Sequence, residues 1–280
     1  MKISKEMVYT LWSGAIIVTV FLALIALIFS SCARQEATAA ATAATAADSQ
    51  QSVPASEIAA EPEAPEATPV PTRLGETEDA GRAYLDRIIF LGDSTTYGIG
   101  YYYTIGFQEL CPPEQIWTPK SGTLTLAYQS IATIVYPETE EELGIPEAVA
   151  RAKPDILLIT LGVNGVSFMD EDYFIREYSA LVRSVQEASP ETRIILNSMY
   201  PVAASYRYQD DINNDKIRAA NAWVERVAED TGCRFLYSYE TLVGEDGYLP
   251  EISQNGDGIH LTGEAFTEVM HYIRTHALPD

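Results

Sequence analysis

Four short polar motifs in the sequence contain the side chains that acyl transfer requires. They are Gly92-Asp93-Ser94, Ser121-Gly122-Thr123, Gly162-Val163-Asn164 and Asp257-Gly258-Ile259-His260. A serine hydroxyl is a weak nucleophile until a base removes its proton, and a carboxylate must hold that base in the correct tautomer. Hydrogen-bond donors must also stabilise the negative charge that develops on the carbonyl oxygen. The four motifs supply a hydroxyl, an imidazole, a carboxylate, a carboxamide and backbone N–H groups for these tasks.

These motifs differ in how specifically they indicate catalysis. Gly-Asp-Ser is also a common turn composition, so Ser94 considered alone is more often part of an ordinary turn. Asn164 after a buried strand has the alternative role of a helix cap. The spacing of Asp257 and His260 is more informative, because one turn can present both side chains toward Ser94.

Four apolar runs, and a fifth weaker one, predict the strands that position these motifs. The runs are 87–92, 155–162, 193–199 and 233–239, and the weaker one is 115–120. Continuous hydrophobicity, rather than alternation, is typical of parallel strands that are covered on both faces.

Helical patterns fall between the strands, at 172–188, 214–230 and 262–278. Alternating strands and helices predict an α/β protein, a three-layer α/β/α sandwich with a five-stranded parallel sheet. Ligands of such sheets bind beyond the carboxyl ends of the strands. The four polar motifs are therefore expected along one edge of the sheet.

With these motifs in place, the chain from residue 84 to residue 280 resembles the SGNH/GDSL hydrolase family. The resemblance rests on "FLGDSTTYG", "KSGT", "LITLGVNG" and "NGDGIHLTGEAF", which occur in the family's order. It implies that Ser94 is the nucleophile, His260 the general base and Asp257 its orienting acid. It also implies an oxyanion hole made of the Ser94 and Gly122 N–H groups and the Asn164 side chain.

The resemblance implies the flavodoxin-like sheet of that family, in agreement with the strand count. Two positions depart from the family pattern. Gly122 lies in "PKSGTLTL", and Gly165 follows Asn164 where many relatives have Asp. We expect no metal or other cofactor.

Several further residues are candidates for roles near the site. Tyr97 follows the nucleophile and Tyr206 lies in the loop after the fourth strand; both are candidate substrate contacts, with loop packing as the alternative. Cys111 and Cys233 either pair or remain free and buried.

Composition divides the chain into three parts. Residues 1–32 form a signal or membrane anchor, 33–83 an Ala-, Thr-, Pro- and Glu-rich disordered tether, and 84–280 the hydrolase domain. The formal charge of the chain is −22, which argues against nucleic acid and against an anionic polymer as partners.

The N-terminal part has three interpretations. The uncharged run 11–29 is long enough to span a membrane as an uncleaved anchor, and the two lysines before it favour an N-terminus inside and the remainder outside. Cys32 after two serines is similar to the lipidation site of bacterial lipoproteins, and Ser31-Cys32-Ala33 also fits a cleavage site for secretion. All three place the hydrolase domain outside the cytoplasm of a bacterium.

The sequence thus predicts a membrane-tethered serine esterase that cleaves short acyl esters, such as O-acetyl groups of an envelope or extracellular glycan. One alternative is a glycan acyltransferase that uses the same residues. The other is an envelope glycan-binding protein with a vestigial site.

Overall fold

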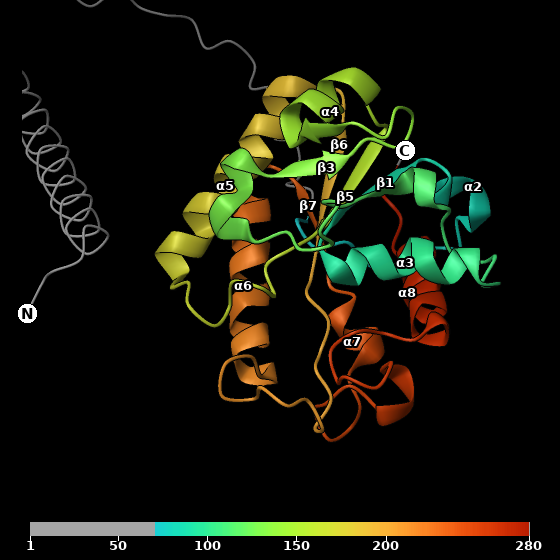
Figure 1. Ribbon diagram of the computed structural model, residues 1–280, viewed down its shortest axis with the longest axis vertical. Coiled ribbons are helices and arrows are strands. Elements are labelled where there is room, and N and C mark those ends of the chain that lie inside the picture. The colour runs from blue at the N-terminus through green and yellow to red at the C-terminus, as the bar shows by residue number, and fades with distance from the viewer. Residues whose placement is uncertain (1–70, 280) are drawn as a thin grey trace, which may run out of the picture. The chain divides into compact units, whose positions relative to one another are not determined.

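A five-stranded parallel sheet forms the centre of the fold (Figure 1). The computed structural model describes residues 71–279. The strand order is β2-β1-β5-β6-β7, and every neighbouring pair is parallel. The strands are β1 (Ile88–Gly92), β2 (Ile116–Trp117), β5 (Ile156–Thr160), β6 (Arg193–Asn197) and β7 (Arg234–Leu236). All five predicted strands are confirmed, including the weak run at 115–120, which contributes two residues.

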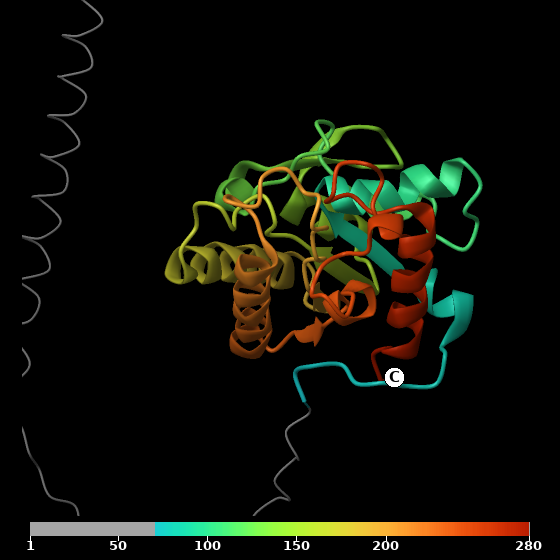
Figure 2. The ribbon, with the colours of Figure 1, turned by 90° about the horizontal axis from the view of Figure 1, so that it is seen from below.

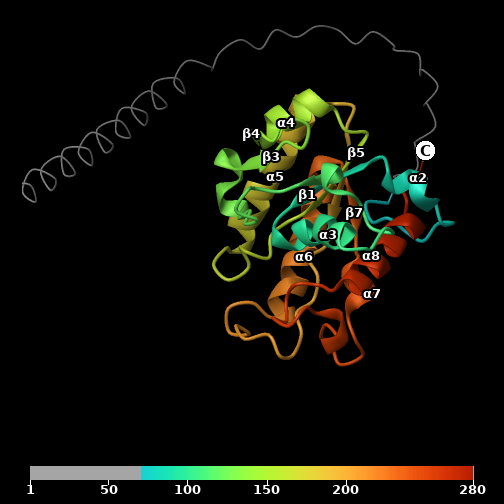
Figure 3. The ribbon, with the colours of Figure 1, turned by 45° about the vertical axis from the view of Figure 1, so that its right-hand side comes forward.

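Helices cover both faces of the sheet, as Figure 2 shows from below. Because successive side chains of a strand point to opposite faces, Leu91 packs with one buried cluster and Phe90 with the other. Helices α4 (Ile145–Ala152), α5 (Glu171–Ala188) and α6 (Asn214–Thr231) cover the first face. Helices α2 (Gly81–Leu85), α3 (Ser94–Thr104) and α8 (Gly263–Thr275) cover the second, with α3 beside α8 (Figures 1 and 3). This is the predicted three-layer sandwich.

The three predicted helices begin at side-chain caps. Asp170, Asn213 and Thr262 each accept a hydrogen bond from a backbone N–H in the first turn of α5, α6 and α8. Helix α6 ends at Gly232, whose φ of 69° is readily available only to glycine. Caps and apolar stripes together explain why these helices could be predicted from the sequence.

Other elements were not predicted. The helices that were not predicted are α2, α3, α4 and the short α7 (Tyr239–Leu242). Three 3₁₀ turns were not predicted either: η1 (Pro113–Gln115), η2 (Leu126–Ile131) and η3 (Glu251–Ser253). Strands β3 (Thr133–Val135) and β4 (Glu142–Gly144) form a separate antiparallel pair. Helix α3 lacks an apolar stripe, because its buried positions include Thr95, Thr96 and Gly100 beside Ile99.

The folded part begins before residue 84, the boundary expected from composition. Leu74 N–H donates to Phe235 O at 2.8 Å, and Phe235 N–H donates to Thr72 O at 2.9 Å, so this segment continues the edge at β7. The Leu74 side chain is buried, and Arg73 forms an ion pair with Glu225. Residues 72–83 therefore belong to the folded unit rather than to the tether, in spite of their polar composition.

The predicted anchor, Cys32 and the tether up to residue 70 lie outside the described residues. Within 71–279, no helix has the length and apolar character needed to cross a bilayer.

The strand order reverses between β1 and β5: the chain adds β2 on one side of β1 and then adds β5 on the other side, with all strands of this sheet parallel. From β1 the chain passes through α3 on one face to β2, and it reaches β5 through α4 on the other face. A crevice is expected beyond the carboxyl ends of strands at such a point. Ser94 and Asn164 follow these two strand ends.

Candidate active site

Ser94 is the first residue of α3 and follows β1 by a single intervening residue. That residue, Asp93, caps the helix, since its Oδ1 accepts the Thr95 N–H at 3.0 Å. A Cβ atom at Gly92 would overlap Thr96 Oγ1 and would lie 2.5 Å from Thr160 O. Only glycine therefore fits where the chain passes from the strand into the helix that starts with Ser94.

The side chains of Ser94, His260 and Asp257 form a continuous hydrogen-bonded line. His260 Nε2 lies 2.8 Å from Ser94 Oγ, and His260 Nδ1 lies 2.6 Å from Asp257 Oδ2. Since an ionised carboxylate can only accept hydrogen bonds, Nδ1 carries the ring proton and Nε2 is free to accept the proton of the serine hydroxyl. This arrangement can activate a serine nucleophile.

A tight turn holds Asp257 against His260. Asp257 Oδ1 accepts the N–H groups of Ile259 at 3.0 Å and His260 at 2.9 Å. Burial raises the pKa of Asp257, but the hydrogen bonds from these two N–H groups and from the His260 ring outweigh burial and lower the pKa below its ordinary 3.8. Asp257 is therefore ionised at neutral pH and can stabilise an imidazolium at His260.

Tyr206, a predicted substrate contact, packs beside this turn. Gly258 has a φ of +84°, and a Cβ atom there would lie 2.7 Å from Tyr206 Cα. Ala203 N–H donates to Gly258 O at 2.8 Å, which ties the loop before Tyr206 to the turn. The Tyr206 ring also contacts the Tyr208 ring, with centroids 5.9 Å apart. Tyr206 is not among the residues that line the cleft in front of Ser94, and its role as a substrate contact stays a prediction.

Asn164 is held by two acceptors. Its Nδ2 lies 3.2 Å from Asp93 Oδ2 and 3.2 Å from Leu124 O. A Cβ at Gly165 would lie 2.7 Å from Met169 Sδ and 3.2 Å from Gly162 O, so a side chain there would require the Met169 side chain to shift. Gly165 N–H donates to Gly162 O at 2.7 Å within the turn that presents Asn164.

The two backbone donors predicted for the oxyanion hole differ. Ser94 N–H is at the first position of α3, where a helix offers no internal acceptor. Within residues 71–279 this N–H donates to no backbone carbonyl, so it is available to an oxyanion. Gly122, with a φ of +72°, donates its N–H to Pro119 O at 2.8 Å within a turn. Gly122 can donate to an oxyanion only if this turn opens, and its role stays a prediction.

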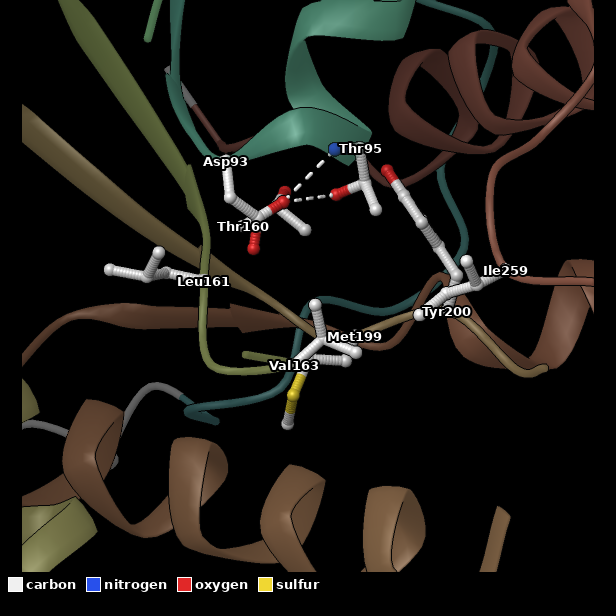
Figure 4. A pocket seen from close by; sticks show the side chains of 8 residues that line it. All are labelled: Asp93, Thr95, Thr160, Leu161, Val163, Met199, Tyr200 and Ile259. Atoms are coloured by element: carbon white, nitrogen blue, oxygen red, sulfur yellow. Dashed lines mark hydrogen bonds between the residues drawn. The ribbon is translucent and has the colours of Figure 1, made fainter. Parts of the chain in front are cut away.

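The Asp93 carboxylate connects the nucleophile's helix to Asn164. Oδ1 accepts from the backbone and hydroxyl of Thr95, at 3.0 and 2.8 Å, and Oδ2 accepts from Asn164. Asp93 is fully buried, and burial raises its pKa despite these hydrogen bonds. Behind it lies a cavity of about 10 Å³, the space of one water molecule, with Thr160 and Tyr200 also in its wall (Figure 4).

In front of Ser94 lies an open cleft of about 290 Å³. Its lining includes His260, Tyr97, Tyr101, Tyr102 and Phe266. Tyr97 is thus placed where a substrate contact was predicted. Tyr101 and Tyr102 also follow the nucleophile closely in the sequence, and the 94, 97, 101 spacing places Tyr101 on the same side of the helix as Ser94.

The two cysteines of the folded unit are free and buried. Cys111 Sγ contacts Met270 Sδ at 3.9 Å, and burial raises the pKa of Cys111 to about 12. Of the two alternatives left open by the sequence, free burial is the one observed.

A parallel α/β sandwich that presents a Ser-His-Asp line at the carboxyl ends of its strands defines a class of serine hydrolases. The chain belongs to the GDSL-like Lipase/Acylhydrolase family, whose family model matches residues 90–266. The resemblance drawn from the four motifs is confirmed at this level. The protein is thus a GDSL-family acylhydrolase.

Solved structures with a similar fold have low sequence identity to this chain. A GDSL-like lipase from Bacteroides thetaiotaomicron is 21% identical with a TM-score of 0.49, and the match covers 67% of this chain and 85% of that one. A putative acylhydrolase from Bacteroides fragilis is 18% identical, with a TM-score of 0.48 and coverage of 71% and 96%. A carbohydrate esterase of family 3 from Talaromyces cellulolyticus is 14% identical, with a TM-score of 0.43 and coverage of 67% and 92%. No curated protein matches the chain.

Proposed function

We propose that the protein is a serine esterase that hydrolyses short-chain acyl esters, such as O-acetyl groups of a cell-envelope or extracellular glycan. The observation that supports this most is the unbroken line from Ser94 Oγ to His260 at 2.8 Å and on to Asp257 at 2.6 Å. Nucleophile, base and orienting acid are already within the distances that acyl transfer needs.

In the first step, Ser94 Oγ attacks the ester carbonyl carbon while its proton passes to His260 Nε2. The imidazolium that forms lies against Asp257, which stays ionised and stabilises the positive charge. The carbonyl π electrons move to the oxygen, which becomes the oxyanion.

Two donors are placed to stabilise that oxyanion. One is Ser94 N–H, at the positive end of the α3 dipole. The other is Asn164 Nδ2, for which the oxyanion would replace Leu124 O as acceptor, because a full negative charge attracts an N–H donor more strongly than a neutral carbonyl does. Asp93 would keep its hydrogen bond to Asn164 throughout and hold the amide in place.

In the second step, the intermediate collapses and the bond to the alcohol oxygen breaks. The alcohol takes the proton from His260 Nε2 and leaves an acyl group on Ser94. A water molecule then attacks the acyl carbon, with His260 removing its proton, and the proton returns to Ser94 Oγ as the free acid is released. Each of these steps uses only groups of the chain, the ester and water.

A short acyl group fits the dimensions of the site. The cleft at Ser94, about 290 Å³, is at the lower limit of ligand pockets and must hold part of the alcohol as well as the acyl group. Tyrosines in its wall offer apolar faces with polar tips, which suits a sugar ring. These features support a glycan O-acyl ester as substrate.

The test is hydrolysis of p-nitrophenyl acetate by the full-length chain purified in detergent. We expect turnover in the wild type and a loss of at least about a thousandfold in Ser94→Ala. Ser184→Ala is the matched control, because this serine lies on α5 and donates only to Leu181 O. Equal rates in Ser94→Ala and the wild type would refute the proposal.

Hydrolysis and acyl transfer differ only in which hydroxyl His260 deprotonates in the second half of the reaction. Partitioning of the acyl group between water and an added oligosaccharide measures the difference, and we expect most of it to reach water. The hydrogen-bonded line at Ser94 argues against a protein that binds glycans without turning them over.

The proposal includes an extracytoplasmic, membrane-tethered location, which rests on residues 1–83. We expect the full-length protein in the membrane fraction and accessible to protease added from outside. Cys32→Ala distinguishes a lipoprotein from a membrane-spanning anchor. It abolishes incorporation of labelled fatty acid if Cys32 is lipidated, and it leaves the protein in the membrane fraction if residues 11–29 remain as an anchor. Recovery in the cytoplasm would refute this part.

A further inference from the structure

A second cleft adjoins the cleft at Ser94. Its volume is about 490 Å³, and it lies between α3 and the segments 113–120 and 135–140. Tyr97 and Tyr101 line both clefts, whereas Ser94 and His260 line only the first. The reaction steps described above use no residue that belongs to the second cleft alone.

The two shared tyrosines form a stripe that starts at the nucleophile. Positions 94, 97 and 101 are three and four residues apart, so they are neighbours along one face of α3. The Tyr97 and Tyr101 side chains are 54% and 49% exposed, so they are not core residues. Tyr101 is steadied by an edge contact with the Tyr102 ring, with centroids 5.3 Å apart.

The remaining wall of the second cleft mixes apolar and polar groups. Thr104, Thr118, Lys120 and Glu114 are among its lining residues. An alkyl chain would leave these polar groups without partners, which is costly. An anionic polymer would meet Glu114 and Glu140 in a chain of charge −22. A neutral sugar, with a C–H face for the tyrosine rings and hydroxyls for the polar groups, satisfies both kinds of lining.

The direction of the proton transfer fixes where the alcohol portion lies. Its oxygen must receive the proton of His260 Nε2, so the alcohol lies within the first cleft, which His260, Tyr97 and Tyr101 all line. A longer alcohol can then continue over these two rings into the second cleft. We propose that the second cleft binds further sugar units of a neutral polysaccharide whose ester group lies at Ser94. This inference rests on the proposed esterase function.

The experiment compares acetylated cello-oligosaccharides of one and six units as substrates of the full-length chain. We expect kcat/KM to be about tenfold higher for six units, a gain of ~1.4 kcal/mol, which two aromatic rings can supply. Tyr101→Ala should reduce this ratio, and Thr104→Trp should bring it close to one by filling the second cleft alone. Tyr128→Ala is the control, because this tyrosine is 64% exposed and lines neither cleft.

A ratio near one in the wild type, or one that Thr104→Trp leaves unchanged, would overturn the proposal. A parallel series of p-nitrophenyl esters with longer acyl chains tests the competing occupant. Rates that rise with acyl length and fall in Thr104→Trp would show that an alkyl chain fills the cleft and would also overturn it. If no ester is cleaved in a Ser94-dependent manner, the proposed function itself fails, which is distinguishable from a failure of the length dependence alone.

Discussion

Replacing Asp93 by asparagine tests how the candidate oxyanion donor is held. The new amide would present N–H groups to Asn164 Nδ2, so two donors would face each other across 3.2 Å. Turning the Asn164 amide over relieves this conflict but places its oxygen against Leu124 O, which is also an acceptor. Neither orientation satisfies both neighbours, and we expect Asn164 to leave the position required for the oxyanion.

The magnitude follows from the hydrogen bond that is lost. A hydrogen bond to a charged group contributes about 1.5–3 kcal/mol, so kcat should fall by about 10- to 100-fold. Asn164→Ala, which removes the donor altogether, should cost about 100- to 1,000-fold. In the double variant the two losses should not multiply, because the asparagine oxygen can keep the Thr95 hydrogen bond that caps α3, and the substitution then disturbs the oxyanion only through Asn164.

Stability distinguishes this effect from unfolding. Burial raises the pKa of Asp93, so its contribution to stability is present below the ordinary pKa of 3.8 and is lost as the pH rises through the raised value. An asparagine side chain does not ionise, so the Asp93→Asn variant does not lose stability in this way as the pH rises. We expect its free energy of unfolding at pH 7 to stay within about 1 kcal/mol of that of the wild type. Thr95→Val is the control, since it removes only the hydroxyl bond to Asp93 and should change kcat by less than about fivefold.

The assay is kcat on p-nitrophenyl acetate, together with urea unfolding at pH 4 and pH 7. Losses that multiply in the double variant, or an Asp93→Asn variant with more than half of the wild-type kcat, would refute the role assigned to Asp93.

Three further predictions concern the turn at His260 and the buried thiol. Asp257→Asn should lower kcat by about 10³–10⁴-fold, because an amide N–H facing Nδ1 moves the ring proton to Nε2. The contribution of Asp257 to the free energy of unfolding should be present above pH 3.8 and lost as the pH falls through its lowered pKa. Acid unfolding of the wild type and the Asp257→Asn variant measures this contribution. Gly258→Ala should lower the melting temperature more than Gly256→Ala, because both glycines have positive φ but only at Gly258 does a Cβ meet a neighbour; equal melting temperatures would contradict this. Cys111, with its pKa raised to about 12, should react with iodoacetamide at pH 8 only after unfolding, and mass spectrometry of the native and unfolded chain decides the point.

The features predicted from the sequence are those that repeat a regular physical pattern. Continuous apolar runs identified four of the five strands, because strands covered on both faces have no polar side, and a weaker run identified β2. The pairing of Ser94 with Asp257 and His260 was expected from motifs at successive strand ends. The structure places the three side chains in contact, although they come from opposite ends of the domain.

The features missed by the sequence depend on contacts between distant segments. Helix α3 buries threonine and glycine beside the sheet, so it has no apolar stripe to recognise. Leu74 lies in a polar segment and becomes buried only because it pairs with the edge at β7. The close packing of the Tyr206 backbone against Gly258, which requires the absence of a side chain at Gly258, is likewise a contact between distant segments.

Two carboxylates near His260 acquire different roles from their surroundings. Burial raises the pKa of Asp93, and its hydrogen bonds run to Thr95 and Asn164, away from the imidazole. Hydrogen bonds lower the pKa of Asp257, which is partly exposed and contacts Nδ1 directly. Only Asp257 contacts the ring, so it is the carboxylate that stabilises the positive charge when the ring becomes an imidazolium. The charge that stabilises the imidazolium and the charge that holds the oxyanion donor are thus kept apart, so each can be removed by substitution and measured without loss of the other.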